Sequence, residues 1–356
     1  MAVRVRALEE AGAGAGAAWD AFARAEPSAT FLHLSPWARV IRDAFGHATH
    51  YAMAEQDGAV AGVLPLARMR TRLFGDALVS TPFCVYGGPA AATPEAAAAL
   101  ESWALDLMRR TGAPSLEFRH ARPPGEGWPG ADWPARPSLY HTFRRAIRGD
   151  AEADMKAIPR KQRAMVRKGI SNGLRSESRA GAAEADRLHR VYAESVRNLG
   201  TPVFPRRYFR LLAEAFPDAH DVTTVLDPAG DPVAAVMNFH FREEVLPYYG
   251  GGTADARRLA ANDFMYWEVM RRAGAERGAR LFDFGRSKAG TGAFDFKRNW
   301  GFEPRPLHYA YRLREGARLP EHNPSNPKYA MLIAAWRRLP LPVANLLGPR
   351  LVRGLG

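Results

Sequence analysis

The chain repeats one arrangement of predicted secondary structure, and this repeat constrains its fold more than any other feature. In the first half, a hairpin predicted at residues 50–69 precedes a strand, residues 77–88, that ends in Tyr86-Gly87-Gly88. In the second half, a hairpin at residues 220–241 precedes a strand that ends in Tyr249-Gly250-Gly251. We interpret the halves as two copies of one unit. The alternative is chance similarity in a chain rich in Ala and Arg.

Each copy continues in the same order after its Tyr-Gly-Gly segment. A helix, a glycine, a short strand that contains an acid, a loop and a final strand follow. The predicted helices cover residues 94–110 and begin again near Asn262, the short strands cover 115–120 and 280–285, and the final strands cover 139–147 and 307–313. A hairpin, a third strand, a helix and an adjacent strand predict a mixed sheet with helices packed on it.

The repeat therefore predicts an α/β (α+β) protein of two tandem domains with a cleft between them, where ligands tend to bind. We expect an N-terminal domain at residues 1–150 and a C-terminal domain at residues 175–316. A basic linker helix at residues 151–174 joins them, and a basic apolar tail, residues 317–356, follows.

Composition excludes several classes of protein. With 47% hydrophobic and 24% charged residues, the chain of 356 residues is expected to fold and not to be disordered. The lone cysteine, Cys84, excludes an intramolecular disulfide and a cysteine-cluster metal site, and we expect it to be buried. The histidines show no metal-binding spacing, so no metal is expected. The sequence contains neither a recognisable signal peptide nor a membrane-spanning apolar run, and we expect a cytoplasmic protein.

The charge of the chain favours anionic partners. Its net charge is +13, although the excess of arginine over lysine is also typical of a GC-rich genome. The predicted linker helix carries Arg160, Lys161 and Arg163, which form either a solvated basic face or a clamp for phosphate. The helix lacks the interleaved aromatic residues of single-strand binders, so no stable nucleic-acid complex is expected.

The stretch LFDFGRSKAGTGAFDFKRNWGF, residues 281–302, is the strongest candidate for a site. It begins as a buried strand and continues into a loop of small residues. Asp283, Arg286 and Lys288 flank that loop, and Lys297 follows between aromatic residues. A structural turn does not need so many charges, whereas a site that holds an anion or a developing oxyanion does. The alternative for Lys297 is a surface residue paired with Asp295.

Four segments of the chain resemble the FemAB family. These are IPRKQRAMVRKG before the second domain, YYGGG followed by a helix, FDFGRS, and FDFKRNWGF. The family comprises peptidoglycan-bridge aminoacyltransferases and their relatives, built from two tandem GNAT-like acyltransferase domains. Within the family, the chain resembles the subgroup associated with exosortase and PEP-CTERM systems. The long helical arm of some members is absent, and a typical pyrophosphate loop is not legible.

The resemblance implies roles for individual residues. It places Phe296 and Lys297 at the reacting centre, with the Lys297 ammonium aimed at the carbonyl oxygen of an ester or thioester. Asp283 is a further catalytic candidate, and Arg286, Lys288 and Tyr249 are candidates for contacting substrate. The resemblance also leads us to expect direct attack by the acceptor amine, with Asp283 or Tyr249 as fallback bases.

Two further segments have open interpretations. Trp37, in FLHLSPWARVIRDAFGH, either walls an acceptor pocket or belongs to the core of an amphipathic helix. The tail over residues 327–356 is apolar and basic and contains no acid. It either packs over a domain as a strap or lies on an anionic membrane surface, which would place the protein peripherally at the inner membrane.

The sequence therefore predicts a transferase that forms an amide on an amine of a cell-envelope or exopolysaccharide-associated substrate. Its donor is acyl-CoA or aminoacyl-tRNA, and the sequence does not decide between them. One alternative is an acyl-CoA-dependent N-acetyl- or N-acyltransferase that acts on a small molecule or protein. The other is a non-catalytic, anion- or nucleic-acid-binding scaffold of an export system.

Overall fold

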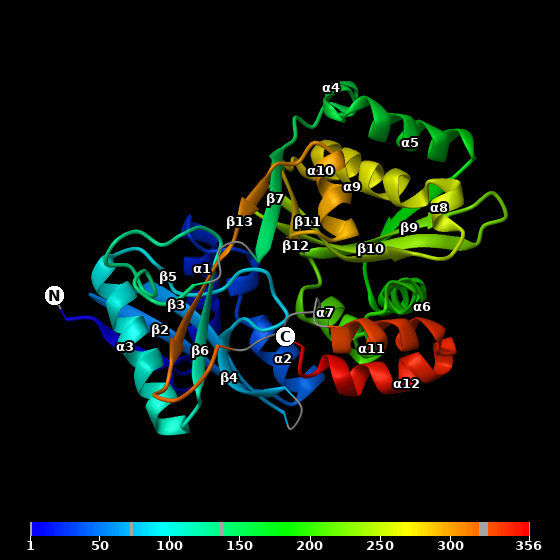
Figure 1. Cartoon of the computed structure of the whole chain (residues 1–356). Coiled ribbons are helices and arrows are strands. Elements are labelled where there is room, and N and C mark those ends of the chain that lie inside the picture. Colours follow the sequence, from blue (N-terminus) through cyan, green and yellow to red (C-terminus); the bar gives the residue numbers. More distant parts are fainter. Residues whose placement is uncertain (1, 72–73, 136–138, 320–326, 356) are drawn as a thin grey trace. The chain divides into compact units, whose positions relative to one another are not determined.

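The computed structural model describes residues 2–71, 74–135, 139–319 and 327–355. The chain forms two compact units (Figure 1). Unit 1 contains residues 1–140, 306–321 and 353–356, and unit 2 contains residues 141–305 and 322–352. Each unit holds one seven-stranded mixed sheet, which confirms the predicted fold class. The predicted cleft between the domains stays a prediction.

Unit 1 is built on a sheet with the strand order β1-β2-β3-β4-β6-β14, and the short β5 pairs with β3. Helix α3 packs against β2 and β3, and its side chains Leu100 and Leu107 belong to the core. The strands are β1 Arg4–Ala7, β2 Ala48–Gln56, β3 Ala59–Thr71, β4 Gly75–Ser80, β5 Ala90–Ala91, β6 Ser115–His120 and β14 His308–Leu313. The helices are α1 Ala15–Ala25, α2 Pro36–Phe45 and α3 Pro94–Thr111.

Unit 2 is built on a sheet with the order β13-β7-β12-β11-β10-β9-β8. In Figure 1, α9 and α10 cover one face of this sheet, and α6 lies on the other. The strands are β7 Tyr140–Ala146, β8 Arg175–Arg179, β9 His220–Leu226, β10 Pro232–Phe241, β11 Glu244–Gly252, β12 Leu281–Lys288 and β13 Pro304–Pro306. The helices are α4 Ala151–Ala157, α5 Arg160–Ser171, α6 Ala182–Leu199, α7 Arg206–Ala215, α8 Ala256–Leu259, α9 Ala261–Arg277, α10 Gly292–Asn299, α11 Pro327–Arg338 and α12 Leu341–Val352.

The repeat predicted from the sequence is present in the fold. In unit 1 the hairpin β2–β3 precedes β4, helix α3 and strand β6. In unit 2 the hairpin β9–β10 precedes β11, helix α9 and strand β12. The third strand of each copy pairs in parallel with the strand after the helix, β4 with β6 and β11 with β12. The two halves are therefore copies of one topology.

The final strands of the two copies are exchanged. Strand β7, encoded at the end of the first copy, lies in the sheet of unit 2 beside β12. Strand β14, encoded at the end of the second copy, pairs antiparallel with β6 of unit 1, with His308 opposite His120 and Leu313 opposite Ser115. The predicted boundaries at residues 150 and 316 therefore do not follow the compact units, because each copy completes the other sheet.

Two predicted elements differ from the structure. The strand predicted at residues 77–88 ends at Ser80, because Pro82 has no amide hydrogen for a sheet and Thr81 and Phe83 have φ angles of 45° and 67°. The strand predicted at residues 280–285 extends to Lys288, and helix α10 follows it. Thr291 caps α10 by accepting a hydrogen bond from the Phe294 amide at 3.3 Å.

The predicted linker helix and tail both pack on unit 2. Helix α5 packs against α9, where a Cβ on Gly169 would lie 2.8 Å from the Cβ of Phe264. Helices α11 and α12 pack against α6. A Cβ on Gly348 of α12 would lie 2.9 Å from the Val203 amide nitrogen, so the helix approaches the backbone closely. Residues 327–352 therefore form a strap over unit 2, one of the two readings of the tail.

The strand exchange predicts that residues 1–150 do not fold as an independent domain. Without β14 the edge of β6 has no partner, and β7 has no sheet to join. We expect a fragment of residues 1–150 to show weak chemical-shift dispersion and a broad thermal transition. A fragment in which a flexible linker appends residues 306–316 to residues 1–139 should recover a cooperative transition. Cooperative folding of the 1–150 fragment with β7 ordered would contradict the exchange.

Candidate active site

The candidate site lies in unit 2, where two parallel strands diverge. Strands β11 and β12 pair at Glu244–Leu281 and Val245–Phe282. Within the described residues they pair no further, although β11 continues to Gly252 and β12 to Lys288. Beyond the Val245–Phe282 pair, the described residues of the two strands form no further β-ladder with each other. An extended ligand can add to strand edges that diverge in this way and leave an opening.

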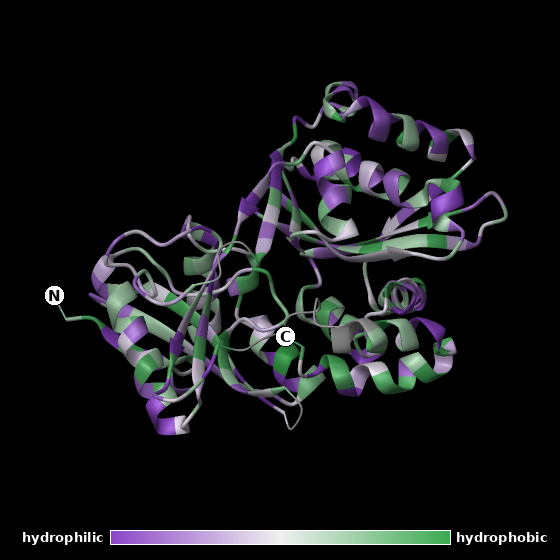
Figure 2. Cartoon of the chain, viewed as in Figure 1, coloured by the Kyte–Doolittle hydropathy of each residue, from purple (hydrophilic) through white to green (hydrophobic). Residues whose placement is uncertain are grey.

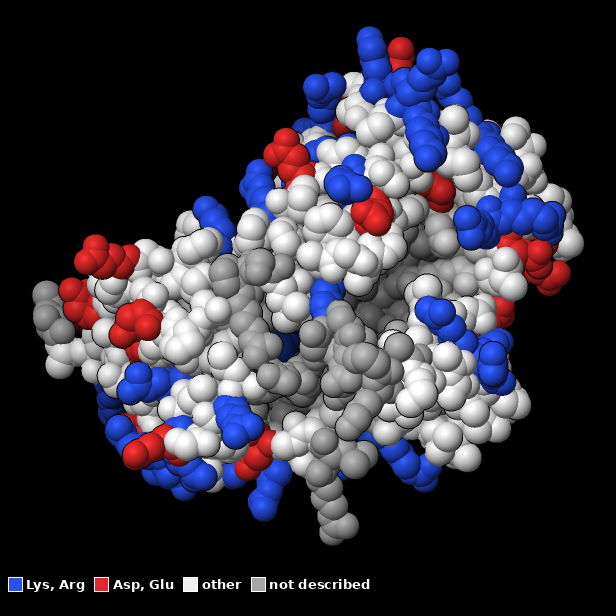
Figure 3. All heavy atoms as spheres, in the orientation of Figure 1, with Lys and Arg blue, Asp and Glu red and all other residues white. Residues whose placement is uncertain are grey.

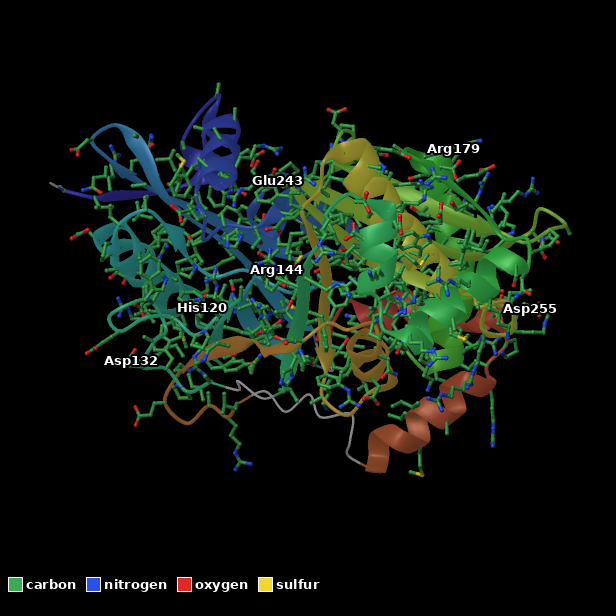
Figure 4. The ribbon with its side chains drawn as sticks, turned by 90° about the horizontal axis from the view of Figure 1, so that it is seen from above. His120, Asp132, Arg144, Arg179, Glu243 and Asp255 are labelled. Atoms are coloured by element: carbon green, nitrogen blue, oxygen red, sulfur yellow. The ribbon has the colours of Figure 1, made fainter. Side chains whose placement is uncertain are left out.

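Strand β12 has a local backbone irregularity at Gly285, called the bulge below, beside this opening. Gly285 has a φ of +65°, in the left-handed region that glycine adopts without strain. The Asp283 carboxylate accepts a hydrogen bond from the Gly285 amide at 2.7 Å. Arg144, labelled in Figure 4, reaches Asp283 from β7, with 3.1 Å between Nε and Oδ2, and donates to Glu244 at 2.5 Å. Asp283 is fully buried, so these contacts describe a group that fixes the bulge and not an exposed base.

Lys297 extends from α10 back to this bulge. Its ammonium donates to the carbonyl of Arg286 at 2.9 Å and to that of Gly285 at 3.3 Å. The same nitrogen lies 5.5 Å from the ring centre of Phe143 and 5.9 Å from that of Phe284. Lys297 as a whole residue is partly exposed, although its amine is strongly desolvated. Because an ammonium has three hydrogens, the two carbonyls leave one for a third acceptor.

Burial lowers the pKa of Lys297 to about 7, since the apolar surroundings disfavour the charged amine. The negative charge of Asp283 opposes this shift, and the positive charge of Arg286 adds to it. Asp295, the partner expected if Lys297 were a surface residue, pairs instead with Arg298 at 3.1 Å. Lys297 is therefore a desolvated cation poised near neutrality, as in many active sites.

Phe143 and Phe284 lie beside the Lys297 amine, whereas Phe296 is directed elsewhere. Phe296 packs against Tyr266, Phe284 and Trp300, with ring centres 5.7, 6.3 and 6.2 Å away, and is partly buried against the core of unit 2. Adjacent residues of a helix point about 100° apart, so Phe296 faces the core while Lys297 faces β12. Phe143 of β7 walls the amine instead. Phe143 is not predictable from the sequence, because the strand exchange is what places it there.

The predicted substrate-contacting residues of unit 2 occupy different environments. Arg286 and Lys288 lie on one face of β12 and are half-buried, and burial lowers the pKa of Lys288. Tyr249 is buried, and its hydroxyl lies 2.6 Å from that of Tyr208. Tyr249 therefore fills the aromatic core beneath α6 and α7, whereas Arg286 and Lys288 remain at the edge of the opening.

Helix α5 is anchored to α9 through the face opposite its exposed basic residues. The Gln162 side chain donates to Asp263 of α9 at 2.7 Å. Arg160 and Lys161 are exposed, and Figure 3 shows Lys and Arg side chains gathered over this part of unit 2. Arg163 donates to the Lys156 carbonyl at 3.0 Å. Arg160 and Lys161 are thus presented to solvent on an ordered helix, and their role in binding an anion stays a prediction.

Trp37 lies in unit 1 and is a core residue. It is fully buried, donates from Nε1 to the Phe31 carbonyl at 3.2 Å, and packs edge-on against the Phe31 ring. A side chain without exposed surface cannot wall an open pocket. The contacts of Trp37 are those of the alternative, a core tryptophan on α2.

The corresponding opening of unit 1 is filled by the chain itself. Within the described part of unit 1, strands β4 and β6 also pair at two positions, Leu78–Leu116 and Val79–Glu117. The segment from Thr81 to Gly88 enters beside β6: the Gly87 amide donates to the Arg119 carbonyl at 2.9 Å, and the Arg119 guanidinium donates to the Cys84 carbonyl at 2.8 Å. Cys84 is fully buried, as expected. Among the residues that the structure describes, an opening with a desolvated lysine amine beside it occurs in unit 2.

A polar cluster not predicted from the sequence lies under α9. His240 Nε2 lies 2.6 Å from Asp221, and Ser178 donates to the same carboxylate at 2.9 Å, beside a cavity of about 140 Å³. The serine and the histidine both contact the aspartate and not each other. Since a nucleophilic triad needs the serine hydroxyl bonded to the histidine, this cluster does not have that arrangement.

Sequence comparison identifies the domain that contains the lysine. Residues 159–298 match the acetyltransferase (GNAT) domain family, and this range begins just before α5 and includes Lys297. No curated protein is similar enough to the chain to match it. The chain therefore carries a GNAT-type acyltransferase domain, which confirms the predicted enzyme class.

Solved structures extend the likeness to both units. FemX is 15% identical, with a TM-score of 0.63 over 86% of this chain and 97% of FemX. A tandem GNAT protein of the clavulanic acid pathway, solved without AcCoA, is 15% identical, with a TM-score of 0.53 over 89% of this chain and all of that one. The C-terminal domain of a putative lysylphosphatidylglycerol synthetase from Agrobacterium fabrum is 14% identical, with a TM-score of 0.53 over 83% of this chain and 91% of that one. The fold is thus that of tandem GNAT proteins.

Asp283→Asn is expected to lower the pKa of Lys297 further. The substitution removes the negative charge that favours the ammonium, while the burial that disfavours it remains. A pH titration of ¹³C-labelled lysine side chains by NMR measures the shift. Asp295→Asn is the matched control, because this nearby carboxylate pairs with Arg298 and should leave the pKa of Lys297 unchanged. An unchanged or higher pKa in Asp283→Asn would contradict the assigned electrostatics.

Proposed function

We propose that the protein transfers an acyl or aminoacyl group from an activated ester or thioester to an amine, with Lys297 stabilising the oxyanion. The observation that carries this proposal is the Lys297 ammonium, held by two backbone carbonyls against Phe143 and Phe284 beside the opening of β11 and β12. A fixed cation of low solvation is the group that an acyl-transfer transition state requires.

The chemical step can be written from this geometry. The acceptor nitrogen attacks the carbonyl carbon, a C–N bond forms, and the carbonyl oxygen gains the negative charge. The Lys297 ammonium uses its third hydrogen to donate a hydrogen bond to that oxygen and keeps its proton. Collapse of the tetrahedral intermediate breaks the bond to the thiolate or alkoxide, which takes up the proton lost by the amine. The amide is the product, and no metal takes part in this proposal.

Neighbouring groups have supporting roles in the proposal. Asp283 positions the bulge through the Gly285 amide and keeps a negative charge near Lys297. Phe296 supports α10 from the core. Arg286 and Lys288, at the edge of the opening, contact the donor or acceptor, and Arg160 and Lys161 attract an anionic donor to unit 2.

The donor is either acyl-CoA or aminoacyl-tRNA. The lysylphosphatidylglycerol synthetase among the similar structures favours an aminoacyl donor, and the tandem GNAT protein favours AcCoA. We place the acceptor amine on a cell-envelope or exopolysaccharide-associated molecule, as the resemblance to the FemAB family, including its PEP-CTERM-associated subgroup, implies. Incubation with each donor and a panel of such amines, followed by mass spectrometry of the amide, distinguishes the two donors. Transfer from neither would favour a non-catalytic scaffold.

Lys297→Met is expected to lower kcat by about 10²–10³ with little change in KM, because the lost contact forms in the transition state. Steady-state transfer with whichever donor is active measures the effect. Arg298→Met is the matched control, since this neighbouring cation is exposed and pairs with Asp295. The melting temperature of Lys297→Met should not fall, because a buried amine is costly to charge. Retained activity in Lys297→Met would refute the proposed role.

A further inference from the structure

Exposed large hydrophobic side chains are concentrated near the end of the chain. The described residues contain eight such side chains, and six of them lie in residues 331–355. A seventh, Leu199, ends α6, and its carbonyl accepts a hydrogen bond from Arg337 of α11. Scattered exposed hydrophobics are normal on a protein surface, but a local concentration marks an interaction site. The six are Met331, Leu332, Val343, Leu346, Leu347 and Leu355.

The helices that carry these residues are already anchored on their inner face. Helices α11 and α12 both pack against α6 (Figure 1). On α12, the buried residues are Ala344, Gly348 and Val352, which repeat every four positions. On α11, Ile333 lies close to Gly200 at the end of α6. The inner face is thus a packed interface, and the exposed apolar residues are additional to it.

The outer face of α12 is apolar where a surface helix is normally polar. Val343, Leu346, Leu347 and Arg350 follow the spacing i, i+3, i+4 and i+7, and all four are exposed. Leu346 is 63% exposed, and Leu332 of α11 is 66% exposed. Figure 2 shows α12 as mostly hydrophobic along its length. No described part of unit 2 covers this stripe.

Charges of only one sign accompany the apolar stripe. Residues 327–356 contain no Asp or Glu, and their charged residues are Lys328, Arg337, Arg338, Arg350 and Arg353. Arg338 and Arg350 are exposed. Figure 3 shows uncharged surface over α11 and α12 with Lys and Arg at its margin. A bilayer with anionic headgroups has an apolar interior beneath a negatively charged surface. Exposed leucines beside charged residues that are all basic complement such a surface.

We propose that α11 and α12 form a peripheral docking surface for an anionic lipid bilayer. Leu332, Leu346 and Leu347 enter the boundary between headgroups and acyl chains, and Arg338 and Arg350 contact lipid phosphates. None of the described helices is long and apolar enough to cross a membrane. This proposal does not depend on the transfer reaction, so a failure of either leaves the other standing.

Sedimentation of the full chain with lipid vesicles tests the proposal. We expect binding to vesicles of phosphatidylglycerol and phosphatidylcholine, at least tenfold weaker binding to phosphatidylcholine alone, and loss of binding at high salt. The double variant Leu332→Gln/Leu346→Gln should weaken binding at least tenfold. Arg338→Gln/Arg350→Gln should weaken it about fivefold per arginine on the anionic vesicles only.

Ile170→Gln is the matched control, because Ile170 is a large hydrophobic residue, 49% exposed, on α5 and outside the docking surface. It should bind vesicles as the unmodified chain does. Absence of vesicle binding, or equal weakening by the control, would overturn the proposal. So would a dimer that light scattering detects without lipid and that Leu332→Gln/Leu346→Gln dissociates, because the stripe would then be covered by a second copy.

Discussion

Strand β7 is encoded in the first copy of the repeat but completes the sheet of unit 2, and the candidate site is built around this placement. Phe143 of β7 faces the Lys297 amine, and Arg144 reaches both Asp283 and Glu244. Arg145 donates to the Trp300 carbonyl at 2.9 Å, which ties the strand to the end of α10. One exchanged strand thus supplies an apolar wall, an ion pair beneath the bulge and a link to the helix that carries the lysine.

Holding an ammonium in this place is costly, and the surroundings offset only part of the cost. Removing a charge from water costs several kcal/mol unless polar groups replace the lost hydration. The carbonyls of Gly285 and Arg286 and the nearby Asp283 carboxylate provide that replacement. The left-handed backbone of Gly285 belongs to the bulge that presents the carbonyls. The result is a cation less stable than one in water, and a negative oxygen placed beside it would be stabilised strongly.

The sequence predicted the parts of the site that lie close together in the chain. Asp283, Arg286 and Lys297 fall within one block, and the repeat predicted the order of strands and helices around it. Phe143 and Arg144 could not be predicted, because no spacing in the sequence links them to that block before the strand exchange is known. The aromatic candidates were Phe296, Tyr249 and Trp37. The residue type alone does not reveal whether an aromatic side chain lines a pocket or fills the core. The helical neighbours Phe296 and Lys297 diverge because consecutive residues point in different directions.

A pH–rate profile shows whether Lys297 acts as a charged donor or as a base. The acceptor should be an aminooxy compound, whose own pKa lies well below neutrality, so that its ionisation does not contribute. The charged form of Lys297 exists below its pKa of about 7. We therefore expect a kcat that is constant on the acid side and falls as the pH rises through that value. A kcat that rises with pH through the same range would contradict it, because a neutral Lys297 would then be the active form.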